Sequence, residues 1–169
     1  ADIVIPGESE KEILLSTYVC HPSMANNELS GPVVTTFIAK HILARKEKPF
    51  FTYRIIFLPE TIGSITYLSI HLEYLKKNVV AGYVVTCVGG PDLFSYLQTR
   101  VENTLVDRVT LHVLAHTEDD YKVYNFLERG SDERQYNAPG IDLPVGSLIK
   151  TKYLDYPEYH TSADNLDFV

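Results

Sequence analysis

Four polar side chains, spread over most of the chain, have the chemistry needed to bind a divalent metal ion or to move a proton. His21 follows an apolar run at residues 11–20, and Glu60 follows a second run at 51–59. Asp132 lies in "RGSDERQY" and His160 in "YPEYHTSADN". Two imidazoles and two or three oxygen ligands converging on one cleft would suit zinc or a similar ion. Such a site is typical of a hydrolase, because a metal polarises a carbonyl and acidifies a water while a carboxylate transfers the proton.

Each of these residues also has an ordinary structural explanation. His21 and His160 could be loop histidines with backbone partners. Glu60 could place a negative charge at the N-terminus of the next helix, where the helix dipole favours an anion. Asp132 could belong to a turn after Gly130. The spacing matches neither a compact zinc finger nor an HExxH helix, so spacing alone is a weak signal.

The elements expected to position these residues alternate between strands and helices. Residues 11–20, 51–59 and 79–90 are apolar, β-rich runs that predict buried strands. Helices are predicted after Pro32 and from about 62 to 77, and a further strand at 142–150. Residues 103–116 could form a helix or a strand. This order predicts an α/β domain with a largely parallel sheet, in which ligands bind at the carboxyl ends of the strands.

Composition restricts the partners. The formal charge is −7 with acidic residues spread along the chain, which argues against nucleic acid or an anionic membrane as the main partner. No apolar run approaches the ~20 residues of a membrane span. The two cysteines, Cys20 and Cys87, lie in no paired motif, so we expect reduced, buried thiols and a cytoplasmic location.

Four segments, in this order, resemble a known superfamily: "CHPSMANNELSG", "PETIGS", "GSDERQYNAPGIDLP" and "EYHTSADN". They are similar to the zinc exopeptidase superfamily of metal-dependent aminopeptidases and glutaminyl cyclases. More closely, they resemble the aminopeptidase-like domain associated with bacterial polysaccharide biosynthesis. The resemblance covers essentially the whole chain, and the "HP…SG" and "YHTSAD" segments are its most specific parts. It implies a three-layer α/β/α sandwich around a mostly parallel mixed sheet.

The resemblance also implies a set of metal ligands. His21 matches the first metal histidine of the superfamily and His160 the last. Asn27 stands where the superfamily usually has an aspartate that bridges two metals. Glu60 falls where the superfamily has two adjacent glutamates, one the general base and the other a ligand. Here that pair reads Pro59-Glu60, so one carboxylate serves one of the two roles, and which one is left open.

Three further residues receive roles from the resemblance. Asp132, in "SDE" where relatives show "SDH", resembles an active-site aspartate beside the metal. Arg134 either meets a substrate carboxylate or pairs with Glu133. Tyr159 is the other candidate substrate-binding residue.

The sequence departs from the family pattern at two ligand positions. Residues 86–87 read Thr-Cys where the family has another aspartate, and Asn27 brings no charge to hold two dications together. One zinc ion bound by His21, Glu60 and His160 is therefore expected rather than two. If Glu60 is a ligand, the base must come from elsewhere, for example Asp132 or Glu28.

These observations predict a metal-dependent aminopeptidase or amidohydrolase that cleaves a peptide or N-acyl bond, with a small peptide or N-acylated molecule as substrate. One alternative is a catalytically degenerate aminopeptidase-like binding domain linked to polysaccharide biosynthesis. Another is a carboxypeptidase- or deacylase-like hydrolase with one zinc ion. Residues 1–169 are expected to be one domain, which could self-associate. The resemblance implies a piece of a longer protein, without an inserted domain and a C-terminal winged-helix region.

Overall fold

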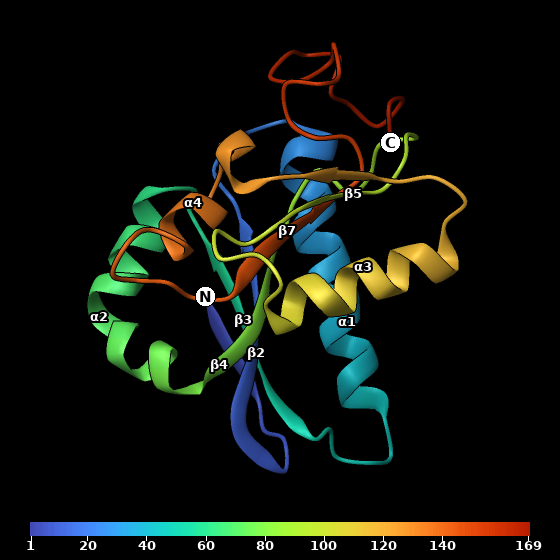
Figure 1. Ribbon diagram of the computed structural model, residues 1–169. Coiled ribbons are helices and arrows are strands. Elements are labelled where there is room, and N and C mark those ends of the chain that lie inside the picture. Colours follow the sequence, from blue (N-terminus) through green and yellow to red (C-terminus); the bar gives the residue numbers. More distant parts are fainter.

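A seven-stranded mixed sheet runs through the centre of the computed structural model, which describes residues 1–169 (Figure 1). The order across the sheet is β1-β3-β2-β4-β7-β5-β6. The four central strands are mutually parallel, whereas β1 pairs with β3 and β5 pairs with β7 in the antiparallel sense. At the far edge β6 pairs with β5 in parallel. The strands are β1 (Asp2–Ile5), β2 (Ser9–Tyr18), β3 (Phe51–Leu58), β4 (Val79–Val85), β5 (Ser95–Leu97), β6 (Lys122–Tyr124) and β7 (Val145–Ile149).

Helices cover both faces of this sheet and complete a three-layer sandwich. Two helices, α1 (Ser30–Ala44) and α3 (Leu105–Thr117), lie on one face, and α2 (Ile62–Asn78) and the short α4 (Glu133–Tyr136) lie on the other (Figure 1). The alternation of side chains along β2 builds both cores, because Leu14 packs in the cluster under α2 and Leu15 in the cluster under α1. The predicted three-layer architecture is confirmed.

Most predicted elements are present, with corrected boundaries. The strand predicted at 79–90 ends at Val85, because the chain turns at residues 86–90 and Cys87 has a positive φ of 49°. Residues 103–116, for which the sequence allowed a helix or a strand, contain most of helix α3. The helix begins with a capping box between Thr104 and Asp107. The edge strand β1 was not predicted. Two short helical turns complete the chain: η1 (Ala25–Leu29), a π-helix, and η2 (Phe126–Glu128).

Helix α1 faces the sheet mainly through small side chains, with Ile42 as its one large buried apolar residue. Thr35 and Ala39 are buried, whereas Phe37 is 64% exposed. At Gly31 the helix approaches the sheet so closely that a Cβ would lie 2.3 Å from the carbonyl oxygen of Val85. Apart from Ile42, the apolar residues at helical spacing therefore border an open surface instead of the core.

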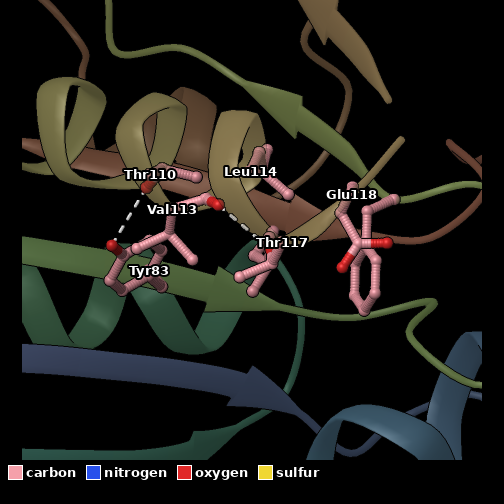
Figure 2. A pocket seen from close by; sticks show the side chains of 8 residues that line it. Tyr83, Thr110, Val113, Leu114, Thr117 and Glu118 are labelled. Atoms are coloured by element: carbon pink, nitrogen blue, oxygen red, sulfur yellow. Dashed lines mark hydrogen bonds between the residues drawn. The ribbon is translucent and has the colours of Figure 1, made fainter. Parts of the chain in front are cut away.

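Two hollows lie on the α1/α3 face of the sheet. One, of about 410 Å³, is lined by twelve hydrophobic residues from the sheet, α1 and α3, among them Ile38 and Val109. The other, of about 240 Å³, lies beneath α3, where Tyr83 and Thr110 share a hydrogen bond of 2.9 Å (Figure 2). None of the residues predicted to bind metal or substrate lines either hollow. No helix in the structure combines the length and apolar character needed to span a bilayer.

Candidate metal centre

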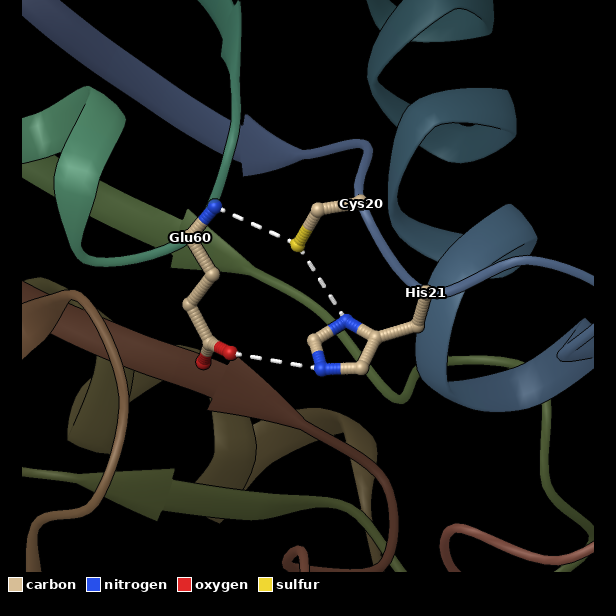
Figure 3. Close-up of side chains that lie close together, drawn as sticks. All are labelled: Cys20, His21 and Glu60. Atoms are coloured by element: carbon tan, nitrogen blue, oxygen red, sulfur yellow. Dashed lines mark hydrogen bonds and ion pairs between the residues drawn. The ribbon is translucent and has the colours of Figure 1, made fainter.

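His21 and Glu60 lie beside each other where β2 and β3 end. The two strands are parallel, and Tyr18 is in register with Leu58, so the residues that follow them meet at the same edge of the sheet. His21 Nε2 lies 3.7 Å from Glu60 Oε2. Figure 3 shows Cys20 beside them, its Sγ 3.3 Å from both His21 Nδ1 and the backbone nitrogen of Glu60. One potential ligand atom from each of these three residues lies within 4.8 Å of the others.

His160 reaches the same edge from the C-terminal end of the chain. The centroids of the His160 and His21 rings are 5.0 Å apart. Tyr159 stacks on the His160 ring at 3.9 Å with an interplanar angle of 15°. His160 has a positive φ of 56°, an uncommon conformation that is enriched at functional sites. The structure thus brings together an early imidazole, a late imidazole and an acid that are far apart in the sequence.

Asp164 attaches the C-terminal loop to the loop that follows His21. Its buried carboxylate accepts hydrogen bonds from the backbone N–H groups of Asn26 at 2.6 Å and Asn27 at 3.0 Å. The backbone carbonyl of Asp164 also accepts a bond of 3.0 Å from Ala25. Because η1 starts at these residues, one buried carboxylate fixes both loops. Figure 1 shows the C-terminal loop at the same end of the sheet as the start of α1.

Asn27 is buried and only partly hydrogen-bonded. Its side-chain nitrogen donates to Tyr18 Oη at 3.3 Å and lies 3.7 Å from Cys87 Sγ. Its Oδ1 is buried without a hydrogen-bond partner. An unpartnered buried carbonyl oxygen is costly unless it binds something else, so this atom is consistent with the predicted ligand role. That role stays a prediction.

Asp132 is fully buried beside the first turn of α2. Its Oδ1 accepts bonds from the backbone N–H of Thr61 at 2.7 Å and from Ser64 Oγ at 2.8 Å, whereas Oδ2 has no partner. Burial raises the pKa of Asp132 to about 6, with smaller contributions from the charges of Glu60 and Glu133, against the opposing effect of the two hydrogen bonds. Such a carboxyl group exchanges protons near neutral pH, as a general acid or base must.

Two contacts of Glu60 and its neighbours were not anticipated. Ser131 Oγ donates a short hydrogen bond to Glu60 Oε1, so the "GSDE" segment supports the glutamate as well as supplying Asp132. Thr61 has a positive φ of 61°, a strained conformation for a β-branched residue, directly after Glu60. The bond from the Thr61 N–H to Asp132 helps to hold that conformation. A serine next to a predicted catalytic aspartate was the only sequence signal for Ser131.

Of the two roles left open for Arg134, the ion pair with Glu133 is not formed. The buried Glu133 carboxylate accepts bonds from the backbone N–H groups of Gly130 and Ser131 and from the hydroxyls of Ser147 and Tyr153. These four donors leave no need for a guanidinium, and Arg134 is exposed. Tyr159 lies at the centre, stacked on His160, and burial raises its pKa to about 12.

The expectation of two buried cysteines is also corrected. Both cysteines are free, and Cys87 is buried, but Cys20 is exposed. The reason is that β2 ends at Tyr18, two residues earlier than predicted, so Cys20 lies in the loop with His21.

The sheet and its carboxyl-edge loops define the class of protein: an α/β fold of the zinc aminopeptidase-like type. BSAP, a zinc aminopeptidase from Bacillus subtilis, shares this fold with a TM-score of 0.77. That likeness covers 99% of this chain and 45% of the other, at 15% sequence identity, so it establishes the fold alone.

The chain belongs to the family described as "Domain of unknown function (DUF4910)", whose model matches residues 1–169. A Clostridium acetobutylicum protein, provisionally named as a polysaccharide biosynthesis protein with aminopeptidase-like domain, is 49% identical over 165 residues, which is 98% of this chain. A crystal structure from the same species, provisionally named as a peptidase, has a TM-score of 0.93 at 48% identity and covers 99% of this chain. The predicted resemblance to the aminopeptidase-like domain is confirmed.

The chain spans only part of these relatives. It covers 37% of the length of the Clostridium acetobutylicum protein and 39% of the chain in the crystal structure.

Proposed function

We propose that this chain carries the metal-binding part of a zinc-dependent hydrolase, an aminopeptidase or amidohydrolase that cleaves a peptide or N-acyl bond. The observation that supports this proposal best is that Glu60 and His160 both lie beside His21. The His21 and His160 ring centroids are 5.0 Å apart, and Glu60 Oε2 lies 3.7 Å from His21 Nε2. The names of the similar proteins agree with this class of activity.

One pair of donor atoms, His21 Nε2 and Glu60 Oε2, has a spacing that suits a zinc ion, and the His160 ring lies next to the His21 ring. With metal–nitrogen and metal–oxygen distances of 2.0–2.2 Å, two ligands of a tetrahedral ion lie about 3.4 Å apart. The 3.7 Å between His21 Nε2 and Glu60 Oε2 is close to that value. Two imidazoles and one carboxylate are a common ligand set for a catalytic zinc ion with one open position. One ion is favoured over two, because Asn27 and residues 86–87 offer no further carboxylate.

A zinc ion bound there would polarise the carbonyl of the scissile bond and make a water molecule more acidic. The structure favours Glu60 as a ligand, because the Ser131 hydroxyl holds its Oε1 and leaves Oε2 facing His21. The proton would then be taken by Asp132, whose Oδ2 has no partner and whose pKa is raised to about 6. Above that pH the carboxylate is ionised and can accept a proton. Arg134, exposed beside Asp132, is available to meet a substrate carboxylate, and Tyr159 to contact the substrate beside His160.

A panel of substrates tests this proposal. Aminoacyl amides, short peptides and N-acetylated sugars would be incubated with the wild-type protein, with Glu60→Gln and with the exposed control Glu73→Gln, in the presence and absence of added zinc. We expect zinc-dependent hydrolysis of at least one class, abolished in Glu60→Gln and unchanged in Glu73→Gln. Hydrolysis that persists in Glu60→Gln would contradict the assigned role.

A second candidate function is binding without turnover. It is favoured by Asn27 and by Thr86-Cys87, which replace two carboxylates of the family pattern, and by the hydrogen bond that Asn27 gives to Tyr18. Under this alternative the protein binds zinc and a peptide or sugar derivative, but hydrolyses none of the panel. Binding measured by calorimetry without product formation would support it.

A further inference from the structure

We propose that Glu28 is a positioning residue, which holds the proton of His21 on Nδ1 and so directs the Nε2 lone pair towards the metal. The effect on metal binding rests on the proposed function, whereas the contact between Glu28 and His21 does not. Glu28 is buried, and its Oε2 lies 3.1 Å from His21 Nδ1. Its Oε1 accepts a short hydrogen bond from the backbone N–H of Cys20. Both oxygens are therefore hydrogen-bonded, which gives Glu28 a supporting role for His21 and the Cys20 backbone.

The tautomer of His21 follows from these contacts. The hydrogen-bond partners of the two ring nitrogens decide which nitrogen carries the proton. An ionised carboxylate accepts hydrogen bonds but cannot donate them, so the nitrogen bonded to it carries the proton. Of the two carboxylates beside the ring, only Glu28 is within hydrogen-bond distance, at 3.1 Å from Nδ1 against 3.7 Å between Glu60 and Nε2, so in the neutral ring Nδ1 carries the proton and Nε2 is unprotonated. Nε2 is the nitrogen that faces Glu60 at 3.7 Å. Cys20 Sγ, 3.3 Å from Nδ1, is a much weaker hydrogen-bonding group than the carboxylate.

The adjacent residues 27 and 28 point their side chains to different neighbours. Asn27 turns its amide to Tyr18 and Cys87, whereas Glu28 turns its carboxylate to His21. The π-helix η1 holds the two side chains in these different directions, because the backbone of residues 25–27 is anchored to Asp164. The only negative charge of the "ANNEL" turn therefore supports one imidazole instead of bridging two ions. A carboxylate behind a metal-bound histidine fixes the ring and makes it a stronger donor.

The test combines the histidine tautomer with zinc affinity. Long-range ¹H–¹⁵N NMR spectra of the zinc-free protein, recorded above the titration range of the imidazoles, identify the protonated nitrogen of His21. Zinc affinity is measured by competition with a chromogenic chelator. The variants are Glu28→Gln, which keeps the size of the side chain, and the exposed control Glu73→Gln, which removes the same charge elsewhere. His21→Asn assigns the resonances.

We expect the wild-type protein to show His21 protonated on Nδ1. In Glu28→Gln the population should shift towards the Nε2–H tautomer and zinc affinity should fall 10- to 100-fold, with Glu73→Gln unchanged. A wild-type His21 protonated on Nε2 would overturn the proposal, even if the variant did not fold. Equal zinc affinity in Glu28→Gln and the wild type would also overturn it. A wild-type Nδ1–H tautomer in a protein that binds no zinc would support the Glu28–His21 pair and contradict the proposed function instead.

Discussion

Asp164 provides a direct test of how the C-terminal loop is held at the candidate metal centre. Its buried carboxylate accepts two backbone N–H bonds, of 2.6 and 3.0 Å, from Asn26 and Asn27. A hydrogen bond to a charged group contributes roughly 1.5–3 kcal/mol, and a buried donor left without a partner costs about 1–3 kcal/mol. Asp164→Asn keeps one acceptor oxygen, removes the charge and leaves one N–H facing an amide nitrogen. We expect a loss of about 2–4 kcal/mol in the free energy of unfolding.

Urea unfolding at neutral pH, followed by far-UV circular dichroism, measures this loss. Circular dichroism is the better probe, because the chain has no tryptophan. The matched control is Asp167→Asn, an exposed aspartate in the same loop, which should change stability by less than about 0.5 kcal/mol. Zinc affinity should also fall in Asp164→Asn, although Asp164 is no ligand, because the loop that carries His160 is loosened. Equal stability of the two variants would refute the argument that Asp164 fixes both loops.

Three further predictions concern the rest of the chain. The pKa of Asp132 is raised to about 6, so the stability from this group is present below pH ~3.8 and lost as the pH rises through 6. Between pH 3.5 and 7.5 the free energy of unfolding of the zinc-free wild type should fall by about 3 kcal/mol relative to that of Asp132→Asn. Parallel curves of unfolding free energy against pH for the two proteins would contradict this. Arg54 Nε lies 2.7 Å from Oε2 of the buried Glu12, so Arg54→Met should cost about 3–5 kcal/mol in thermal or urea unfolding, and adding Glu12→Gln should recover part of it. Gly31→Ala places a Cβ 2.3 Å from the Val85 carbonyl oxygen and should lower the free energy of unfolding in urea by about 1–3 kcal/mol. An unchanged free energy of unfolding would show that α1 can shift.

Much of the parallel sheet could be predicted from the sequence, because buried strands and amphipathic helices leave periodic apolar patterns. The position of Glu60 beside His21 followed from the same logic, since parallel strands end at one edge. The approach of His160 did not. It lies in an irregular loop after β7 that has no periodicity, so only its residue type and the resemblance of "YHTSAD" to a family segment pointed to it.

Other features depend on tertiary contacts that no local pattern encodes. The apolar residues of α1 have helical spacing, yet Phe37 is exposed, because close packing at Gly31 turns the small side chains inward. Neighbouring charges suggested an Arg134–Glu133 pair, but Glu133 is buried among four other donors. The division of roles between Asn27 and Glu28 required the geometry of η1. Self-association and a cytoplasmic location stay predictions.

Zinc binding by the wild-type protein and by His160→Ala tests the central claim most directly. The control is His41→Ala, an exposed histidine on α1 that takes no part in the centre. Competition with a chromogenic chelator gives both stoichiometry and affinity. We expect one zinc ion per wild-type chain, an affinity unchanged in His41→Ala, and an affinity reduced on the order of 100-fold in His160→Ala, because one of the protein ligands is lost. Equal affinity in His160→Ala and the wild type would show that residues 21, 60 and 160 do not share an ion.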